Sequence, residues 1–184
     1  MIYANQMIIC NRHFDFPFIN IFIEKCIKLS DYQITSNMNN IYLSRNNADI
    51  ISSGKRPVAN IIDFYNKFIE NKKNIYSIIP EKLNLVDQIA IINNANKVIS
   101  LIGAGCDNII FTNKLCEFHI LYPNQRKIRI WANCYKNKYH DSLKKCKLYI
   151  VGSVDYNIEK KGSDPYNWPW IIDLDQIKKI GIFN

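Results

Sequence analysis

Two glycines and the polar residues after them form the segment of this chain with the clearest chemical potential. An apolar run over 98–102 leads into Gly103, Ala104, Gly105, Cys106, Asp107 and Asn108. Glycine permits a sharp turn and lets a ligand approach the main chain closely, while a helix start presents unpaired N–H groups. This order of strand, glycine turn and helix start suits phosphate binding. A purely structural strand-to-helix turn fits the same residues equally well.

The glycine turn departs from the two common phosphate-binding motifs. No Gly-Lys-Ser/Thr follows it, as a P-loop requires. Asn108 stands where the dinucleotide fingerprint has its third glycine. The turn therefore predicts an anion site without indicating which of the known nucleotide folds would hold it.

Two arginines are placed to assist such a site. Arg45 ends a predicted strand over 41–45, and Arg56 precedes the predicted start of the next helix. At the carboxyl edge of a parallel sheet, both guanidinium groups could clamp a diphosphate. A solvated or salt-bridged arginine is the simpler interpretation of each residue taken alone.

The other reactive side chains form no recognised constellation. His13, His119 and His140 have no metal-ligand spacing, so no metal site is predicted. His119 lies in an apolar run, where a hydrogen-bonded core imidazole is expected. Gln88 is interpreted as an amide at the core edge that bonds to backbone. No Ser/His/Asp or Cys/His order indicates nucleophilic catalysis.

The elements that would position these residues alternate along the chain. Apolar patterns predict helices over 18–29, 57–69, 85–95, 107–113 and 173–180, and strands over 41–45, 75–79, 98–102, 118–122, 128–132 and 147–154. This alternation predicts an α/β fold, with a Rossmann-like parallel sheet and helices on both faces. Residues 41–184 are expected to form this domain, and residues 1–40 a partial N-terminal segment or linker.

The composition of the chain indicates which partners and which cellular compartment are expected. The formal net charge is +8, but the lysines are scattered, so nucleic acid is not the expected partner. The six cysteines include no CxxC pair and no signal-peptide pattern precedes them, which predicts reduced thiols in the cytoplasm. No stretch is long enough to span a bilayer, so any membrane association is expected to be peripheral, at the inner face.

Several of these segments together resemble family 61 glycosyltransferases, which include bacterial capsular polysaccharide enzymes and eukaryotic xylosyl- and N-acetylglucosaminyltransferases. The matching features are a strand ending in Ser44-Arg45, Arg56 and Asn60 at a helix start, a helix containing Gln88, and Gly103-Ala104-Gly105 with Asn108 and Phe111. The resemblance covers about residues 41–123, and the segment 170–173 resembles the family's closing segment.

The resemblance implies the nucleotide-sugar-binding half of a GT-B fold and inverting transfer without metal or cofactor. The implied substrates are a nucleotide-sugar, expected to be UDP-linked, and a glycan acceptor. Arg45, with Arg56, would meet the diphosphate, and Gly103 to Gly105 would lie against the donor. Asn108 belongs to this turn, and together with Gln88 it would hold the loop in shape. Asn60 would be a further supporting residue of the donor site.

Three departures from the family pattern leave alternatives open. Ile102 replaces the histidine before Gly-Ala-Gly, and Ile120 falls where the family has a glutamate. About forty residues before Ile41 are too few for the acceptor-binding half, which predicts a missing half or partner chain. No catalytic base is identified. The alternatives are a degenerate, non-catalytic domain that binds a nucleotide or a partner, and a different α/β enzyme with an anion site.

Overall fold

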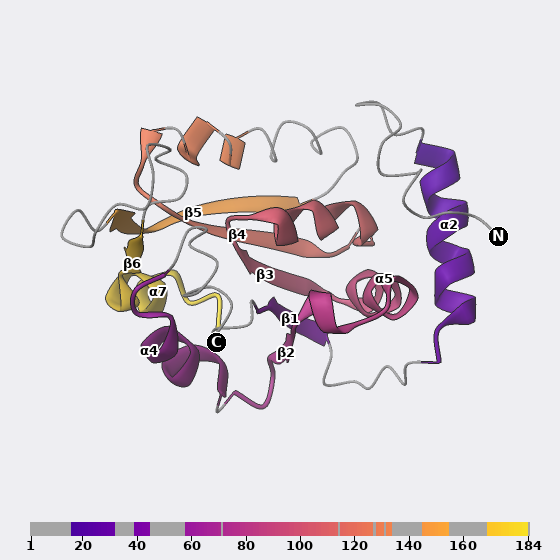
Figure 1. Ribbon diagram of the computed structural model, residues 1–184, viewed down its shortest axis with the longest axis horizontal. Coiled ribbons are helices and arrows are strands. Elements are labelled where there is room, and N and C mark those ends of the chain that lie inside the picture. Colours follow the sequence, from indigo (N-terminus) through magenta and orange to yellow (C-terminus); the bar gives the residue numbers. More distant parts are fainter. Residues whose placement is uncertain are drawn as a thin grey trace.

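A six-stranded, mostly parallel sheet forms the centre of the computed structural model (Figure 1). The structure describes residues 16–31, 39–44, 58–70, 72–113, 115–126, 128–130, 132–133, 145–154 and 169–183. The strands are β1 (Asn40–Leu43), β2 (Tyr76–Ile78), β3 (Lys97–Leu101), β4 (Glu117–Pro123), β5 (Lys145–Val154) and β6 (Trp170–Ile172). Their spatial order is β2-β1-β3-β4-β5-β6.

Strand pairing confirms the predicted Rossmann-like α/β fold. β1 pairs in parallel with β2 and β3, and β4 pairs in parallel with β3 and β5. β6 was not predicted as a strand, and it pairs antiparallel with β5. Its three residues are too few for a periodic sequence signal.

Helical segments connect the strands. They are α2 (Phe16–Leu29), α4 (Ile61–Tyr65), the π-helix η2 (Asn66–Glu70), the 3-10 helices η3 (Pro80–Lys82) and η4 (Ala104–Phe111), α5 (Leu85–Asn94) and α7 (Leu174–Ile180). Asn84, which precedes the helix predicted over 85–95, caps α5 by accepting a hydrogen bond from the Asp87 N–H. Asp173 caps α7 in the same way, which confirms its predicted role at a helix start.

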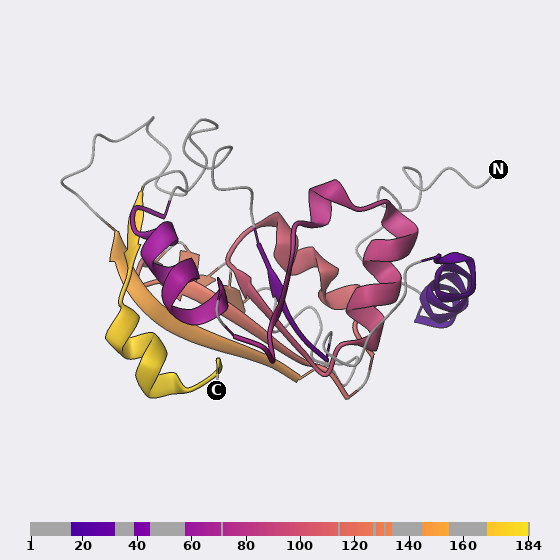
Figure 2. The same ribbon diagram turned by 90° about the horizontal axis from the view of Figure 1, so that it is seen from below.

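The two faces of the sheet are both covered, and each carries its own core. We call them the α5 face and the α4 face. Alternate strand residues point to opposite faces: Val98 belongs to the α5-face core and Ile99 to the α4-face core. The α5 face is covered by α5 and η4, and the α4 face by α4, η2 and α7. Figure 2 shows α5 and α7 on opposite sides of the sheet.

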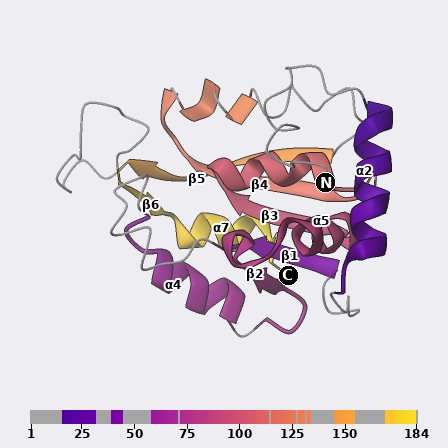
Figure 3. The ribbon, with the colours of Figure 1, turned by 45° about the vertical axis from the view of Figure 1, so that its right-hand side comes forward.

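Helix α2 lies outside this sandwich and packs against α5 (Figure 3). Ile23 and Cys26 of α2 form a small separate core with Ile89 of α5. Just beyond α2, the Ser30 hydroxyl donates a 2.6 Å hydrogen bond to the Asp87 carboxylate. Among the described residues, no helix is long and apolar enough to cross a membrane.

Two local predictions were wrong. The expected strand over 128–132 is helical where it is described, and the Arg129 N–H donates to the Gln125 carbonyl at 2.8 Å. Ile128 and Ala132 are buried four residues apart while Ile130 is 57% exposed, which is a helical rather than an alternating pattern. The apolar residues at 61, 62, 65, 68 and 69 of the helix predicted over 57–69 were expected to share one face, but Ile62 is 55% exposed.

Candidate anion-binding site

The glycine turn lies at the point where the strand order of the sheet reverses. After β1 the chain forms β2 on one side of it, and then β3 and β4 on the other. Leu43 of β1 pairs with Ser100 of β3, so both strands end together at the carboxyl edge. Parallel sheets bind ligands at such a switch point, outside the carboxyl ends of the strands. The Gly103–Gly105 turn follows directly on β3.

Neighbouring strands extend this edge on both sides. Ser44, the residue after β1, is buried and donates its N–H to the Ile78 carbonyl of β2 at 2.7 Å. The Ile102 N–H donates to the Leu121 carbonyl of β4 at 2.9 Å, so β3 and β4 remain paired up to the turn. The turn is therefore anchored on a continuous sheet edge.

The inside of the turn is held by a small buried polar network. The Ser100 hydroxyl donates to the Leu101 carbonyl at 3.0 Å, and the Cys106 thiol lies 3.7 Å from the Ser100 oxygen. The Cys106 N–H donates to the Gly103 carbonyl at 2.9 Å and begins η4. Asn108 donates its side-chain amide to the Gly105 carbonyl at 3.1 Å. These bonds fix the shape of the turn from within.

Gly105 leaves space for a modest side chain. A Cβ atom at Gly105 would meet the Ser100 hydroxyl at 3.4 Å, which is ordinary van der Waals contact. The space around residue 105 therefore does not by itself require glycine. Close approach of a ligand to the main chain is a separate reason for glycine at this position.

Arg45 and Arg56 both lie outside the described residues, so their predicted contact with a diphosphate stays a prediction. Ser44, which precedes Arg45, and Val58, two residues after Arg56, are described. Ser44 ends at the carboxyl edge beside β3, and Val58 forms a parallel bridge with Trp170 of β6.

Asn60 and Gln88, predicted as supporting residues, both bond to backbone. Asn60 exchanges two hydrogen bonds with the main chain of Ile172, which ties the start of α4 to β6. Gln88 donates its side-chain amide to the Pro80 carbonyl at 2.9 Å. Each amide thus fixes a connection between secondary-structure elements.

The two positions that depart from the family pattern are filled by core side chains. Ile102 is 2% exposed and Ile120 is fully buried, and both belong to the α5-face core. Their aliphatic side chains offer a ligand no hydrogen bond.

Sequence reasoning missed the arginines that follow β4. Arg126 and Arg129 are exposed and lie in the segment after β4, which is helical at the described residues 126, 128–130, 132 and 133 and was expected to contain a strand. The spacing of Ile128 and Ala132 fits a helix and a strand equally, and only the exposure of Ile130 between them distinguishes the two.

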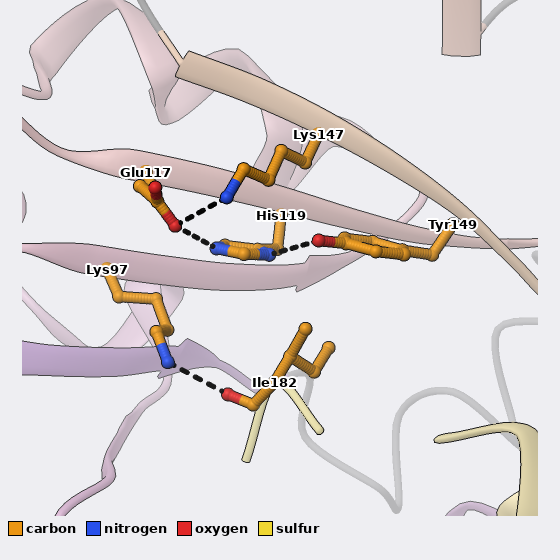
Figure 4. Close-up of polar contacts among 6 residues, drawn as sticks. All are labelled: Lys97, Glu117, His119, Lys147, Tyr149 and Ile182. Atoms are coloured by element: carbon orange, nitrogen blue, oxygen red, sulfur yellow. Dashed lines mark hydrogen bonds and ion pairs between the residues drawn. The ribbon is translucent and has the colours of Figure 1, made fainter. Parts of the chain in front are cut away.

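A second polar cluster lies at the opposite, amino ends of the strands, on the α4 face (Figure 4). His119 is 3% exposed, with Nδ1 3.2 Å from the Tyr149 hydroxyl and Nε2 3.3 Å from a Glu117 oxygen. Glu117 also accepts a 2.9 Å hydrogen bond from Lys147. Nearby, Lys97 donates to the Ile182 carbonyl at 3.1 Å.

The surroundings of His119 favour its neutral form. Burial lowers the pKa of His119 to about 4, and the positive charges of Lys147 and Lys97 act in the same direction, while Glu117 opposes them. The hydrogen bond from Lys147 lowers the pKa of Glu117. The cluster is a buried imidazole held between a phenol and a carboxylate, which agrees with the core role predicted for His119.

Within the described ranges, no group of three or more His, Cys, Asp or Glu side chains could hold a metal ion. Comparison with known proteins identifies one family: the sequence model described as Glycosyltransferase 61 matches residues 1–133. No curated protein matches the chain.

Proposed function

This chain belongs to glycosyltransferase family 61, and we propose that it transfers a sugar from a nucleotide-sugar to a glycan acceptor in the synthesis of cell-surface polysaccharide or glycan. In this proposal it forms the donor-binding half of a GT-B fold, acts in the cytoplasm and uses a UDP-linked donor. Another half or a partner chain would supply the acceptor site.

One observation carries the proposal: the glycine turn lies at the switch point between β1 and β3. Main-chain N–H groups at the start of η4 and the helix dipole favour a negative charge there. The diphosphate of a nucleotide-sugar is such a charge. Ser100, Cys106 and Asn108 hold the turn in one shape, so little reorganisation would be needed when the ligand binds.

The proposed reaction is a single displacement with inversion. The acceptor hydroxyl oxygen forms a bond to the anomeric carbon, and the bond from that carbon to the diphosphate oxygen breaks. The nucleoside diphosphate leaves with the electron pair, and the hydroxyl proton passes to a base outside the residues assigned here. Amide groups at 103–105, with Arg45 and Arg56, would stabilise the charge on the leaving group without a metal ion.

A second candidate is a domain that binds a nucleotide or a protein partner without catalysis. The observation that favours it is the burial of Ile102 and Ile120 in the α5-face core. At these positions the family pattern has a histidine and a glutamate, which could contact the donor. Loss of both would remove transition-state stabilisation while leaving the amide cradle intact.

Thermal unfolding with UDP, GDP and CMP tests whether the site binds a nucleotide. A ligand that binds only the folded chain raises its melting temperature. We expect a rise with one of the three, which Arg45→Ala abolishes and Lys178→Ala, on the far α4 face, leaves unchanged. No rise with any of them would refute the transferase and the nucleotide-binding form of the second candidate, and would leave only the protein-binding form.

Gly105→Val tests the turn itself, because a branched side chain next to the Ser100 hydroxyl would disturb the shape of the turn that the ligand is expected to contact. We expect it to fold and to lose the nucleotide response, while Gly105→Ala folds and retains part of it. Product analysis with UDP-sugars then separates the candidates: transfer or slow hydrolysis of the donor supports the enzyme, and binding without turnover supports the non-catalytic domain.

A further inference from the structure

The segment after β4, helical at the described residues 126, 128–130, 132 and 133, carries two arginines and begins at the carboxyl edge beside the strand that leads into the glycine turn. β4 pairs with β3 through Leu101 and Leu121, so the residues that follow the two strands emerge side by side. The segment after β4 then packs on the α5 face, since Ile128 and Ala132 share a core with Ile109 of η4. The two connections therefore leave adjacent strands and cover the same face.

Within this segment Arg129 lies close along the chain to the end of β4. The Arg129 N–H donates to the Gln125 carbonyl, which places it in the first helical turn. Tyr122, near the end of β4, is only 6% exposed, and burial raises the pKa of its hydroxyl while the positive charge of Arg129 opposes that rise. Ile102, next to the glycine turn, and Tyr122 lie in the same core. Arg129 is exposed.

An arginine side chain would add a full positive charge to the main-chain amides of the glycine turn. Backbone N–H groups supply partial charge, whereas a guanidinium supplies a full charge and a planar pair of donors that matches phosphate oxygens. Five of the twenty-four basic residues in the sequence are arginines, and the two that the structure describes both lie on this segment.

We infer that Arg129 binds the phosphate groups of the ligand held by the Gly103–Gly105 turn. This inference rests on the proposed function, because it assigns a residue to the same donor site. It makes the site a cradle with two sides, one formed by η4 after β3 and the other by the helical segment after β4.

Calorimetric titration of the full chain with UDP, uridine and inorganic pyrophosphate tests the inference. We expect Arg129→Gln to weaken UDP and pyrophosphate binding about tenfold to hundredfold, because a charge-assisted hydrogen bond is lost. Arg129→Lys should weaken both less, since it retains the charge. The affinity for uridine should not change in either variant.

Lys178→Gln is the matched control, because it removes the same charge from exposed α7 on the α4 face. Thermal unfolding without ligand checks that each variant folds. If the unaltered chain binds UDP and Arg129→Gln binds it within about twofold of that affinity, the inference is overturned and the proposed function stands. If the unaltered chain binds none of UDP, GDP, CMP and pyrophosphate, both fail. Equal weakening by Lys178→Gln would show a general charge effect and would also overturn the inference.

Discussion

Asn60 and Ile172 exchange two hydrogen bonds across 112 residues of sequence. The Asn60 amide nitrogen donates to the Ile172 carbonyl at 2.8 Å, and the Ile172 N–H donates to the Asn60 side-chain oxygen at 2.9 Å. The side chain thus takes the place of a neighbouring strand along β6. An unpaired strand edge invites association with other chains, and this contact covers part of that edge.

We expect Asn60→Ala to lower the free energy of unfolding by about 1–3 kcal/mol, because it leaves the Ile172 N–H and carbonyl without these partners. Urea unfolding followed by circular dichroism measures the loss. Asn60→Asp is the informative companion: it still accepts from the Ile172 N–H but cannot donate when ionised. An Asn60→Ala variant as stable as the original would contradict the role assigned to this pair.

Substitution by alanine should lower the free energy of unfolding much more at Gly152 than at Gly105. A Cβ atom at Gly152 would lie 2.0 Å from the Ile171 carbonyl oxygen, which belongs to the backbone of β6 and cannot rotate away. Gly152→Ala should therefore destabilise the chain by about 2 kcal/mol or more. Gly105→Ala, with its nearest contact at 3.4 Å, should change stability far less. Parallel urea titrations compare them, and equal effects would contradict the packing at β6.

His119 should make the chain less stable as the pH falls from about 6.5 toward 4. The pKa of His119 is about 4 in the folded chain against 6.5 in the unfolded chain, so the unfolded state binds more protons between these values. Stability from the neutral imidazole is present above pH 6.5 and is lost as the pH falls. The shift corresponds to about 3 kcal/mol at most.

His119→Gln removes this titration and should flatten the dependence over that interval. Urea midpoints at half-unit pH steps would reveal it. Glu117 adds a separate loss of stability at lower pH. Its pKa is lowered, so its ion pair with Lys147 is lost only when the pH falls far enough to protonate the carboxylate. A His119→Gln profile parallel to that of the original chain would show that another group titrates.

Asn113 should be among the most sensitive polar positions outside the site. Its side-chain nitrogen donates to the carbonyls of Asn93 and Ala95, and its oxygen accepts from the N–H groups of Leu115 and Cys116. Asn113→Ala removes all four bonds and should cost about 2–4 kcal/mol.

Asn93→Ala provides the comparison for Asn113→Ala. It removes one side-chain bond, to the Phe111 carbonyl, and should cost about 1 kcal/mol. Urea unfolding of both variants gives the two values. If the two losses were equal, the four bonds of Asn113 would not act together to join the end of α5 to the start of β4.

The sequence by itself determined the local elements and the glycine turn. Helix caps at Asn84 and Asp173, and the strand, turn and helical start around Gly103, depend on residues within a few positions of one another. Such signals are local, because caps and turns are satisfied by neighbouring backbone groups. The apolar runs of β3 and β4 likewise follow from burial on both faces.

Only the tertiary structure decided which distant residues meet. The reversal of strand order at β1 and β3, which gives the glycine turn its chemical meaning, is a property of the assembled sheet. The helix at 128–132 was hidden because a short apolar segment fits either period until its burial is known. Asn60 found its partner 112 residues away and His119 found Tyr149 on the next strand, since long-range pairing depends on how the elements pack rather than on any local pattern.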